Sequence, residues 1–327
     1  MTATSQGRRK PRRPRPARTG RRGAGRWETR RAWFLVAGIL LVLLGVVIGR
    51  WNGAPRTPGD EPAPVSELRE AVPGDGTRDV PAARAAALDA TADAPFPAPQ
   101  RGGALVALVI DDLGRSVDTI DRLAALGVDM SYSVLPFESR TQQVVRELNE
   151  RGAEILLHLP MEADGAADPG PGSLLRSMNS EELRRRTREA LAAVPGAIGA
   201  NNHMGSALSS DGAALEPVLV ELGERGLFFL DSRTTADSVG FRLARELGIP
   251  AAERRIFLDR EIDRDSIRAQ FRRLLEQAAE RGSAIAIGHP YEETLDVLSQ
   301  EVPLAKEAGF RFVPVSYLME RSGVEAM

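Results

Sequence analysis

The residues best suited to chemistry in this chain are its histidines and one pair of adjacent aspartates. The chain contains three histidines and no cysteine. Asp111 and Asp112 follow the apolar run ALVALVI, while His158 and His289 end the runs AEILLHL and SAIAIGH. His203 follows the short segment GAIGANN. All five residues therefore come at the carboxyl ends of predicted strands, where parallel α/β folds build their active sites.

Two carboxylates and three imidazoles are a suitable donor set for a borderline divalent metal such as zinc, with groups left over for proton transfer. Simpler structural interpretations exist for each residue. Asp111 or Asp112 could cap the next helix, His158 could be a hydrogen-bonded core histidine, and His203 could shape a turn. Adjacent carboxylates at a buried strand end repel each other unless a cation or a proton separates them. The group as a whole therefore favours a metal site.

Other reaction classes have less support. The absence of cysteine excludes a disulfide, a thiolate zinc site and a cysteine nucleophile. Ser206 and Ser232 are candidate nucleophiles for a hydrolase, but neither lies in a G-x-S-x-G elbow. No G-x-G-x-x-G motif follows the first predicted strand, so a dinucleotide site is unsupported.

Short apolar runs alternate with amphipathic segments through most of the chain, which predicts a parallel sheet covered by helices. The predicted strands cover residues 104–110, 131–136, 153–160, 196–202, 226–232, 254–259, 283–290 and 311–318. We expect a helix over residues 180–193, since Asn179 and Glu182 have the spacing of a capping box. An open doubly wound sheet is the alternative architecture. The strands recur without a break into two halves, which favours a distorted (β/α) barrel of seven or eight mostly parallel strands.

The N-terminal region differs sharply from this domain. Residues 1–31 contain twelve Lys or Arg and one acid, so the rest of the chain is acidic, because the whole carries a net charge of −2. A run of 18 uncharged residues follows from Ala32 to Gly49, long enough to span about 27 Å. Trp33 and Trp51 lie near its ends, as expected at a membrane interface.

These features predict a basic cytoplasmic tail (1–31), a transmembrane anchor (32–50), a disordered Pro/Ala-rich linker (51–102) and a folded domain (103–320). The positive-inside rule then makes the chain a single-pass protein of the cytoplasmic membrane, with its domain on the periplasmic side. A cleaved signal peptide is the main alternative to the anchor. The basic tail could also be a nucleic-acid arm, but the adjacent span explains its charge and we expect no nucleic-acid partner.

Several segments together resemble the divergent polysaccharide deacetylases, over about residues 104–319. The segments are VIDDLG, GAEILLHLPME, GANNHMGS, FLDS and IAIGHP. The resemblance implies that Asp111 is the general base, that Asp112 and His158 bind a divalent metal, and that His289 is the general acid. It also implies metal-dependent removal of N-acetyl groups from a glycan of the cell envelope, such as peptidoglycan or an exopolysaccharide.

The chain departs from the family pattern at three places. Glu162 stands where the second histidine of a His-x-x-x-His metal pair is usual, so we expect His203 to supply the third ligand, with Glu162 as the alternative. The segment that normally supplies a substrate-binding Arg reads NNHMGS, and the fourth motif is reduced to residues 231–233. These departures leave open a non-catalytic alternative, a metal-stabilised glycan-binding or envelope-scaffold module. Retention of Asp111 and His289 favours catalysis, because a binding module needs neither a base nor an acid.

Overall fold

The computed structural model describes residues 96–97 and 103–324, with side chains as far as residue 321. The predicted tail, the predicted anchor and almost all of the predicted linker lie outside the described residues. Among the residues that the structure describes, none of the helices is long and apolar enough to cross a membrane. The described residues all belong to the compact unit Val72–Met327.

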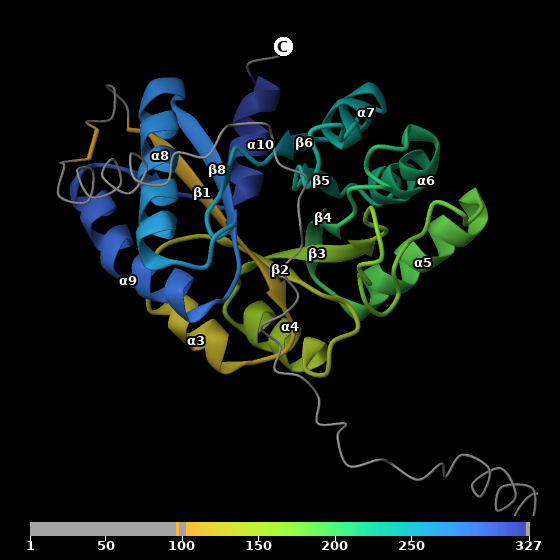
Figure 1. The fold of residues 1–327 in the computed structure, drawn as a ribbon, viewed down its shortest axis with the longest axis horizontal. Coiled ribbons are helices and arrows are strands. Elements are labelled where there is room, and N and C mark those ends of the chain that lie inside the picture. The colour runs from red at the N-terminus through yellow and green to blue at the C-terminus, as the bar shows by residue number, and fades with distance from the viewer. Residues whose placement is uncertain (1–95, 98–102, 325–327) are drawn as a thin grey trace, which may run out of the picture. The chain divides into compact units, whose positions relative to one another are not determined.

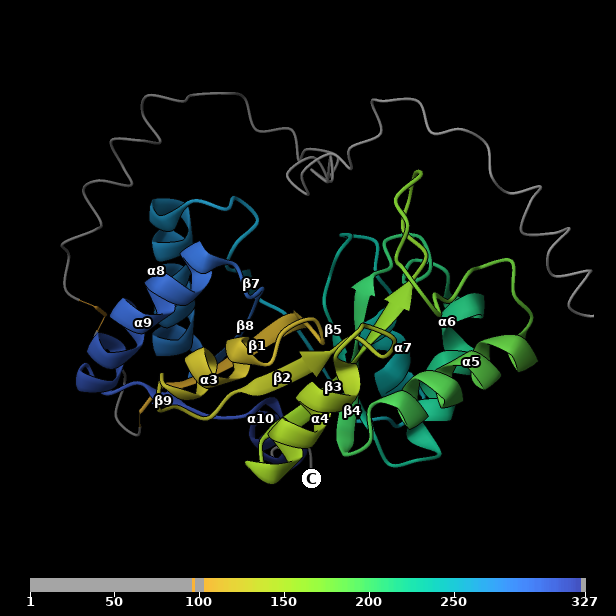
Figure 2. The ribbon, with the colours of Figure 1, turned by 90° about the horizontal axis from the view of Figure 1, so that it is seen from below.

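A curled parallel sheet is the centre of this unit (Figures 1 and 2). Its strands are β1 (Leu105–Leu113), β2 (Ser131–Val134), β3 (Glu154–Met161), β4 (Ala197–Met204), β5 (Phe228–Asp231), β6 (Ala251–Glu253), β7 (Ile256–Phe257), β8 (Ser283–Gly288) and β9 (Arg311–Phe312). Their order is β6-β5-β4-β3-β2-β1-β8-β7, with β9 paired to the start of β1. Every ladder between the described strands is parallel. The predicted α/β fold with parallel strands is therefore confirmed as a curled half-barrel.

Helices follow the strands in alternation. They are α3 (Asp118–Ala124), α4 (Thr141–Glu150), α5 (Ser180–Ala193), α6 (Gly212–Gly223), α7 (Gly240–Glu246), α8 (Arg264–Arg281), α9 (Glu292–Glu307) and α10 (Val315–Val324). Helix α5 has the bounds that the sequence predicts, and the side chain of Asn179 accepts a hydrogen bond from the backbone N–H of Glu182 at 2.9 Å. An amide oxygen in this position satisfies one of the free N–H groups of the first turn.

The alternation of side chains along each strand creates two apolar cores. On β1, Val106, Leu108 and Ile110 pack in the outer core between the sheet and the helices. Their neighbours, including Leu105 and Val109, pack in an inner core on the concave face. Val315 and Leu318 of α10 belong to the inner core, so this helix closes the amino-terminal end of the curled sheet.

The sequence prediction is wrong at the last strand. Residues 311–318 do not form one strand, because only Arg311–Phe312 pair with β1 and α10 begins at Val315. Pro314 has no N–H to contribute to a ladder, and its fixed φ suits the start of a helix. The carboxylate of Glu154 accepts the N–H of Ser316 at 3.3 Å, which stabilises the new helix start.

The described residues form nine strands, whereas seven or eight were predicted, because β6 was missed. Its sequence AAE gives three residues with little strand character. Strands β6 and β7 are consecutive along the chain but lie at opposite ends of the strand order. The sheet therefore curls round on itself without a ladder that closes it between these two strands.

Candidate metal centre and active site

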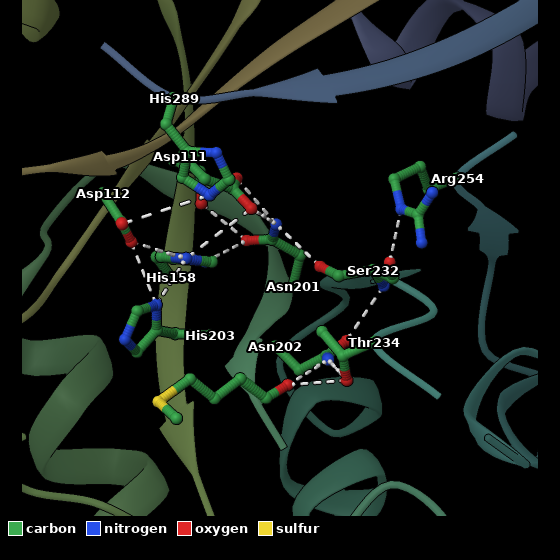
Figure 3. Close-up of polar contacts among 12 residues, drawn as sticks. Asp111, Asp112, His158, Asn201, Asn202, His203, Ser232, Thr234, Arg254 and His289 are labelled. Carbon is green, nitrogen blue, oxygen red and sulfur yellow. Dashed lines mark hydrogen bonds and ion pairs between the residues drawn. The ribbon is translucent and has the colours of Figure 1, made fainter. Parts of the chain in front are cut away.

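The carboxyl ends of four strands bring the predicted residues together (Figure 3). Asp111 and Asp112 lie near the end of β1, His158 in β3 and His203 in β4, and His289 directly follows β8. Because these strands are close neighbours in the curled sheet, their ends converge on one side of the molecule. All three histidines of the chain thus belong to one site.

Three atoms at this site form a nearly equilateral triangle. Oδ1 of Asp112 lies 2.9 Å from Nδ1 of His203 and 3.2 Å from Nε2 of His158, and the two nitrogens are 3.1 Å apart. This spacing is short enough for one ion to contact all three atoms at zinc–ligand distances of about 2.0–2.2 Å. Asp112, His158 and His203 therefore form a group that could hold a metal ion.

Asp112 has the surroundings expected of a metal ligand. Its Oδ1 is buried and has no hydrogen-bond partner among the described residues, although two imidazole nitrogens lie within 3.2 Å. Burial alone would raise the pKa of the Asp112 carboxyl, but His158 and His203, with His289, hold it well below its usual range. Its φ of 57° is in the left-handed region, which turns the side chain at the strand end. A buried and ionised oxygen that faces two imidazole nitrogens is a suitable place for a cation.

His158 is buried, and both of its ring nitrogens are engaged. Nδ1 lies 3.0 Å from Oδ1 of Asn201, which directs Nε2 toward Asp112. Burial acts to lower the pKa of His158, but the facing carboxylates of Asp111 and Asp112 outweigh it and raise the pKa. A bound cation would compete with that proton for Nε2.

Asp111 is also buried, beside the triangle rather than in it. Both of its carboxylate oxygens accept hydrogen bonds from Nδ2 of Asn201, at 2.9 and 3.0 Å. Its Oδ2 lies 3.5 Å from Nε2 of His158. A carboxylate held there can accept a proton from a molecule placed at the triangle.

His289 lies on the other side of Asp112, with its Nε2 4.0 Å from Oδ2 of that residue. Nδ1 of His289 lies 2.9 Å from Oδ1 of Asp259, and the other oxygen of Asp259 accepts bonds from the backbone N–H of His289 and the hydroxyl of Thr294. Burial acts to lower the pKa of His289, but Asp259, with Asp112 and Asp111, raises it to about 9. His289 is therefore held in the protonated form that a general acid requires.

Sequence reasoning missed Asp259 and Asn201. Asp259 ends the predicted strand 254–259, so the strand-end rule that selected the other residues could have found it. Asn201 directly precedes Asn202 and His203, but an amide carries no acid–base signal of its own. Its importance is visible only from its partners on other strands.

Two predicted alternatives lie elsewhere. Glu162 is not part of the triangle: its carboxylate accepts the backbone N–H of Arg176 at 2.6 Å and lies 3.3 Å from the guanidinium of the same residue. The Ser206 hydroxyl accepts a hydrogen bond from the backbone N–H of Asp164. The Ser232 hydroxyl accepts one from Nδ2 of Asn201. Within the described residues, neither serine has a histidine partner that could activate it.

The loop after β5 is held against the site by a half-buried arginine. Nε and Nη2 of Arg254 donate to the carbonyl oxygens of Ser232 and Arg233, each at 2.6 Å. Burial is the main reason that the pKa of Arg254 falls to about 10. The hydroxyl of Thr234 reaches back to the carbonyl of Met204 at 2.9 Å, which ties this loop to the end of β4.

A small hollow of about 80 Å³ opens beside the triangle. His203 lines it, together with Phe137, the Arg115–Glu138 ion pair and the loop at Asp168–Pro171. Phe137 is 41% exposed. The hollow therefore offers an aromatic ring and charged groups to a molecule that reaches the three predicted ligands.

Comparison with known proteins agrees with this geometry. The model of the divergent polysaccharide deacetylases matches residues 108–319. The uncharacterized protein YibQ of Escherichia coli (strain K12) is 36% identical over 197 residues, which cover 60% of this chain and 62% of YibQ. An uncharacterized protein of Haemophilus influenzae is 35% identical over 209 residues, which cover 64% of this chain and 72% of that protein. The chain thus spans less than two thirds of the length of YibQ.

A solved structure is similar as well. The crystal structure of an uncharacterized protein from Agrobacterium tumefaciens C58 superposes with a TM-score of 0.62 at 27% identity, over 68% of this chain and 92% of that chain. The family match covers more than half of the chain and includes every residue of the site described above. On these grounds the resemblance of the sequence motifs is confirmed, and the chain belongs to the divergent polysaccharide deacetylase family.

Proposed function

We propose that this protein is a metal-dependent deacetylase that removes N-acetyl groups from a glycan of the cell envelope. The triangle formed by Asp112, His158 and His203 is the observation that carries the proposal, because a carboxylate and a protonated histidine flank it. Zinc fits this set of one oxygen and two nitrogens. When bound there, it would polarise an amide carbonyl and lower the pKa of a water molecule.

The flanking residues have complementary roles in the proposed reaction. Asp111 accepts a proton from the water that attacks the acetamide carbon. His289, held protonated by Asp259, donates its proton to the departing amine nitrogen as the C–N bond breaks. The water is thereby divided between the products, which are acetate and a free amino sugar. The side chain of Asn201 keeps the Asp111 carboxylate in place through two hydrogen bonds.

The proposed substrate is peptidoglycan or an exopolysaccharide that carries N-acetyl groups. The family description names polysaccharides as the substrate class. The hollow beside His203 offers the exposed ring of Phe137 and the Arg115–Glu138 pair, surfaces on which a sugar ring can pack and hydrogen-bond.

A glycan-binding module without turnover is the second candidate. The position of Glu162 supports it, since this residue replaces a usual metal histidine and bonds Arg176 instead of joining the triangle. A module of this kind would hold a metal for stability and retain glycan without releasing acetate.

Acetate release from a panel of N-acetylated glycans separates the two candidates. In the deacetylase, Asp111→Asn and His289→Ala should each keep their zinc and lose at least about a hundredfold in rate, as is typical for a general base or acid. A wild-type protein that binds zinc and glycan but releases no acetate would identify the binding module. If His289→Ala matches the wild-type rate, its role as general acid is wrong.

A second pair of variants tests the third ligand. His203→Ala should lower zinc occupancy, whereas Glu162→Ala should leave it unchanged, because only His203 lies at the triangle. The opposite result would assign the ligand to Glu162.

We also propose that residues 32–50 anchor the protein in the cytoplasmic membrane with its domain in the periplasm. The basic residues before the apolar run support this orientation. A reporter enzyme that works only outside the cytoplasm, fused after residue 327, should be active. Activity of a cytoplasmic reporter at that position would reverse the proposed orientation.

A further inference from the structure

Asn201 occupies the centre of the site, although it has no acid–base chemistry of its own (Figure 3). It lies in β4 and is fully buried. Its side-chain amide contacts residues from four other strands or their ends: Asp111, Ser133, His158 and Ser232. A buried amide with this many partners has one orientation that satisfies all of them.

The two ends of the amide serve different halves of the site. Its oxygen can only accept, and it lies next to the hydroxyl of Ser133 and Nδ1 of His158. Nδ1 of His158 must therefore carry a proton, so Nε2, which faces Asp112, is the nitrogen that could bind a cation after losing its own proton. The amide nitrogen can only donate, and it reaches both oxygens of Asp111 and the hydroxyl of Ser232.

We propose that Asn201 is a positioning residue that couples the metal ligand His158 to the base Asp111 through one neutral amide. This inference rests on the proposed function and gives the reason why the residue is an amide. A carboxylate at this position would keep the acceptor for His158 but would set a second negative charge against Asp111. An apolar side chain of similar size would support neither residue.

Two substitutions separate these contributions in the full-length protein. Asn201→Asp should keep zinc affinity within about threefold, because the acceptor for His158 remains, while acetate release falls at least about a hundredfold. Asn201→Leu should lower zinc affinity at least about tenfold, since partners of this kind affect metal affinity by about 10–100-fold. Ser133→Ala is the matched control. It removes one neighbour of the amide oxygen but keeps the contacts of Asn201 with His158 and Asp111, so it should change zinc affinity less than about threefold.

Zinc titration against a competing chelator and acetate release provide the two measurements, with circular dichroism to verify that each variant folds. If Asn201→Leu folds and binds zinc as tightly as the wild type, the proposal is overturned. The same holds if Asn201→Asp loses zinc as severely as Asn201→Leu, or if it releases acetate at the wild-type rate.

Imidazole NMR of the metal-free protein tests the coupling independently of catalysis. The chain has only three histidines, so the spectrum is simple. The Nδ1–H proton of His158, held by Asn201, and that of His289, held by Asp259, should both be protected from exchange. Asn201→Leu should remove only the first, while Asn201→Asp keeps both. A wild-type protein that protects the His158 proton but neither binds zinc nor releases acetate would overturn only the proposed function. An unprotected His158 proton in the wild type would overturn the proposed positioning role of Asn201.

Discussion

The two ends of the curled sheet both contain buried polar side chains, but they use them differently. At the amino-terminal end, the hydroxyl of Ser131 donates to Glu154 at 2.6 Å and accepts the N–H of Val315 at 3.0 Å. Glu154 also accepts the N–H of Ser316. These bonds fix α10 under the inner core. At the carboxyl-terminal end, Oδ1 of Asp112 is buried without a hydrogen-bond partner among the described residues.

The backbone shows the same contrast. The described residues other than glycine with a positive φ are Asp112, Met204 and Arg233, and each lies at or just after the end of β1, β4 or β5. Such backbone costs about 1–3 kcal/mol per residue and persists only where the surroundings enforce it. Burial of polar groups is therefore common to both ends, whereas a buried carboxylate oxygen facing two imidazoles, together with a strained backbone, distinguishes the carboxyl-terminal end.

The largest expected effect is at the triangle. His158→Ala removes one of the three proposed ligands, so zinc content should fall at least about tenfold and acetate release at least about a hundredfold. Metal analysis of the purified protein measures the first effect. Ser131→Ala, at the opposite end of the sheet, is the control and should keep full zinc content. If His158→Ala contains as much zinc as the wild type, the carboxyl-terminal end of the sheet does not differ from the amino-terminal end in metal binding.

The next effect concerns the pH profile. As the proposed general acid, His289 can donate a proton only below its pKa, which Asp259 helps to raise to about 9, so the rate should fall as the pH rises through that region. Asp112, Asp111 and the ring of Tyr291 also face His289. Asp259→Asn removes the nearest negative charge, so the alkaline limb of the pH–rate profile should move at least about one pH unit lower. An unchanged limb would show that a different group sets it.

A smaller effect is expected at the amino-terminal end. Glu154→Ala leaves the hydroxyl of Ser131 and the N–H of Ser316 without their acceptor, which should cost about 1–3 kcal/mol in the free energy of unfolding. Urea denaturation measures this loss. Glu246→Ala breaks an exposed ion pair with Arg242 and should cost less than about 0.5 kcal/mol. Loss of zinc in the Glu154 variant would show that the two ends are not independent.

The smallest effect is expected in the hollow beside His203. Phe137→Ala removes an exposed ring, so KM for a glycan should rise about threefold to tenfold while kcat stays nearly constant. Leu304→Ala, which removes an exposed side chain from α9, should change neither constant. A decrease in kcat for Phe137→Ala would indicate a role in the reaction rather than in binding.

Much of this arrangement could be predicted from the sequence, since strand-end residues of a parallel sheet must converge. The sequence favoured His203 as the third candidate ligand but left Glu162 as an alternative, because the choice depends on where the chain goes after β3. The carboxylate of Glu162 bonds Arg176, fourteen positions later, and no local pattern specifies that contact. The parallel register of β3 and β4 pairs Pro160 with His203 and thereby brings this histidine to Asp112. The helix at Val315 was missed for a similar reason, because its start depends on the distant Glu154.

The central position of β1 has a consequence for synthesis of the chain. This strand begins the domain, yet its partners include β8 and β9, and Leu105 pairs with both Ser283 and Arg311. At a translation rate of about 5–20 residues per second, roughly 10–40 s pass between the appearance of Leu105 and that of these partners. During this interval one edge of an apolar strand has no partner, and the site lacks His289. The unpaired edge of β1 is therefore open to non-native pairing until its last partner strand emerges.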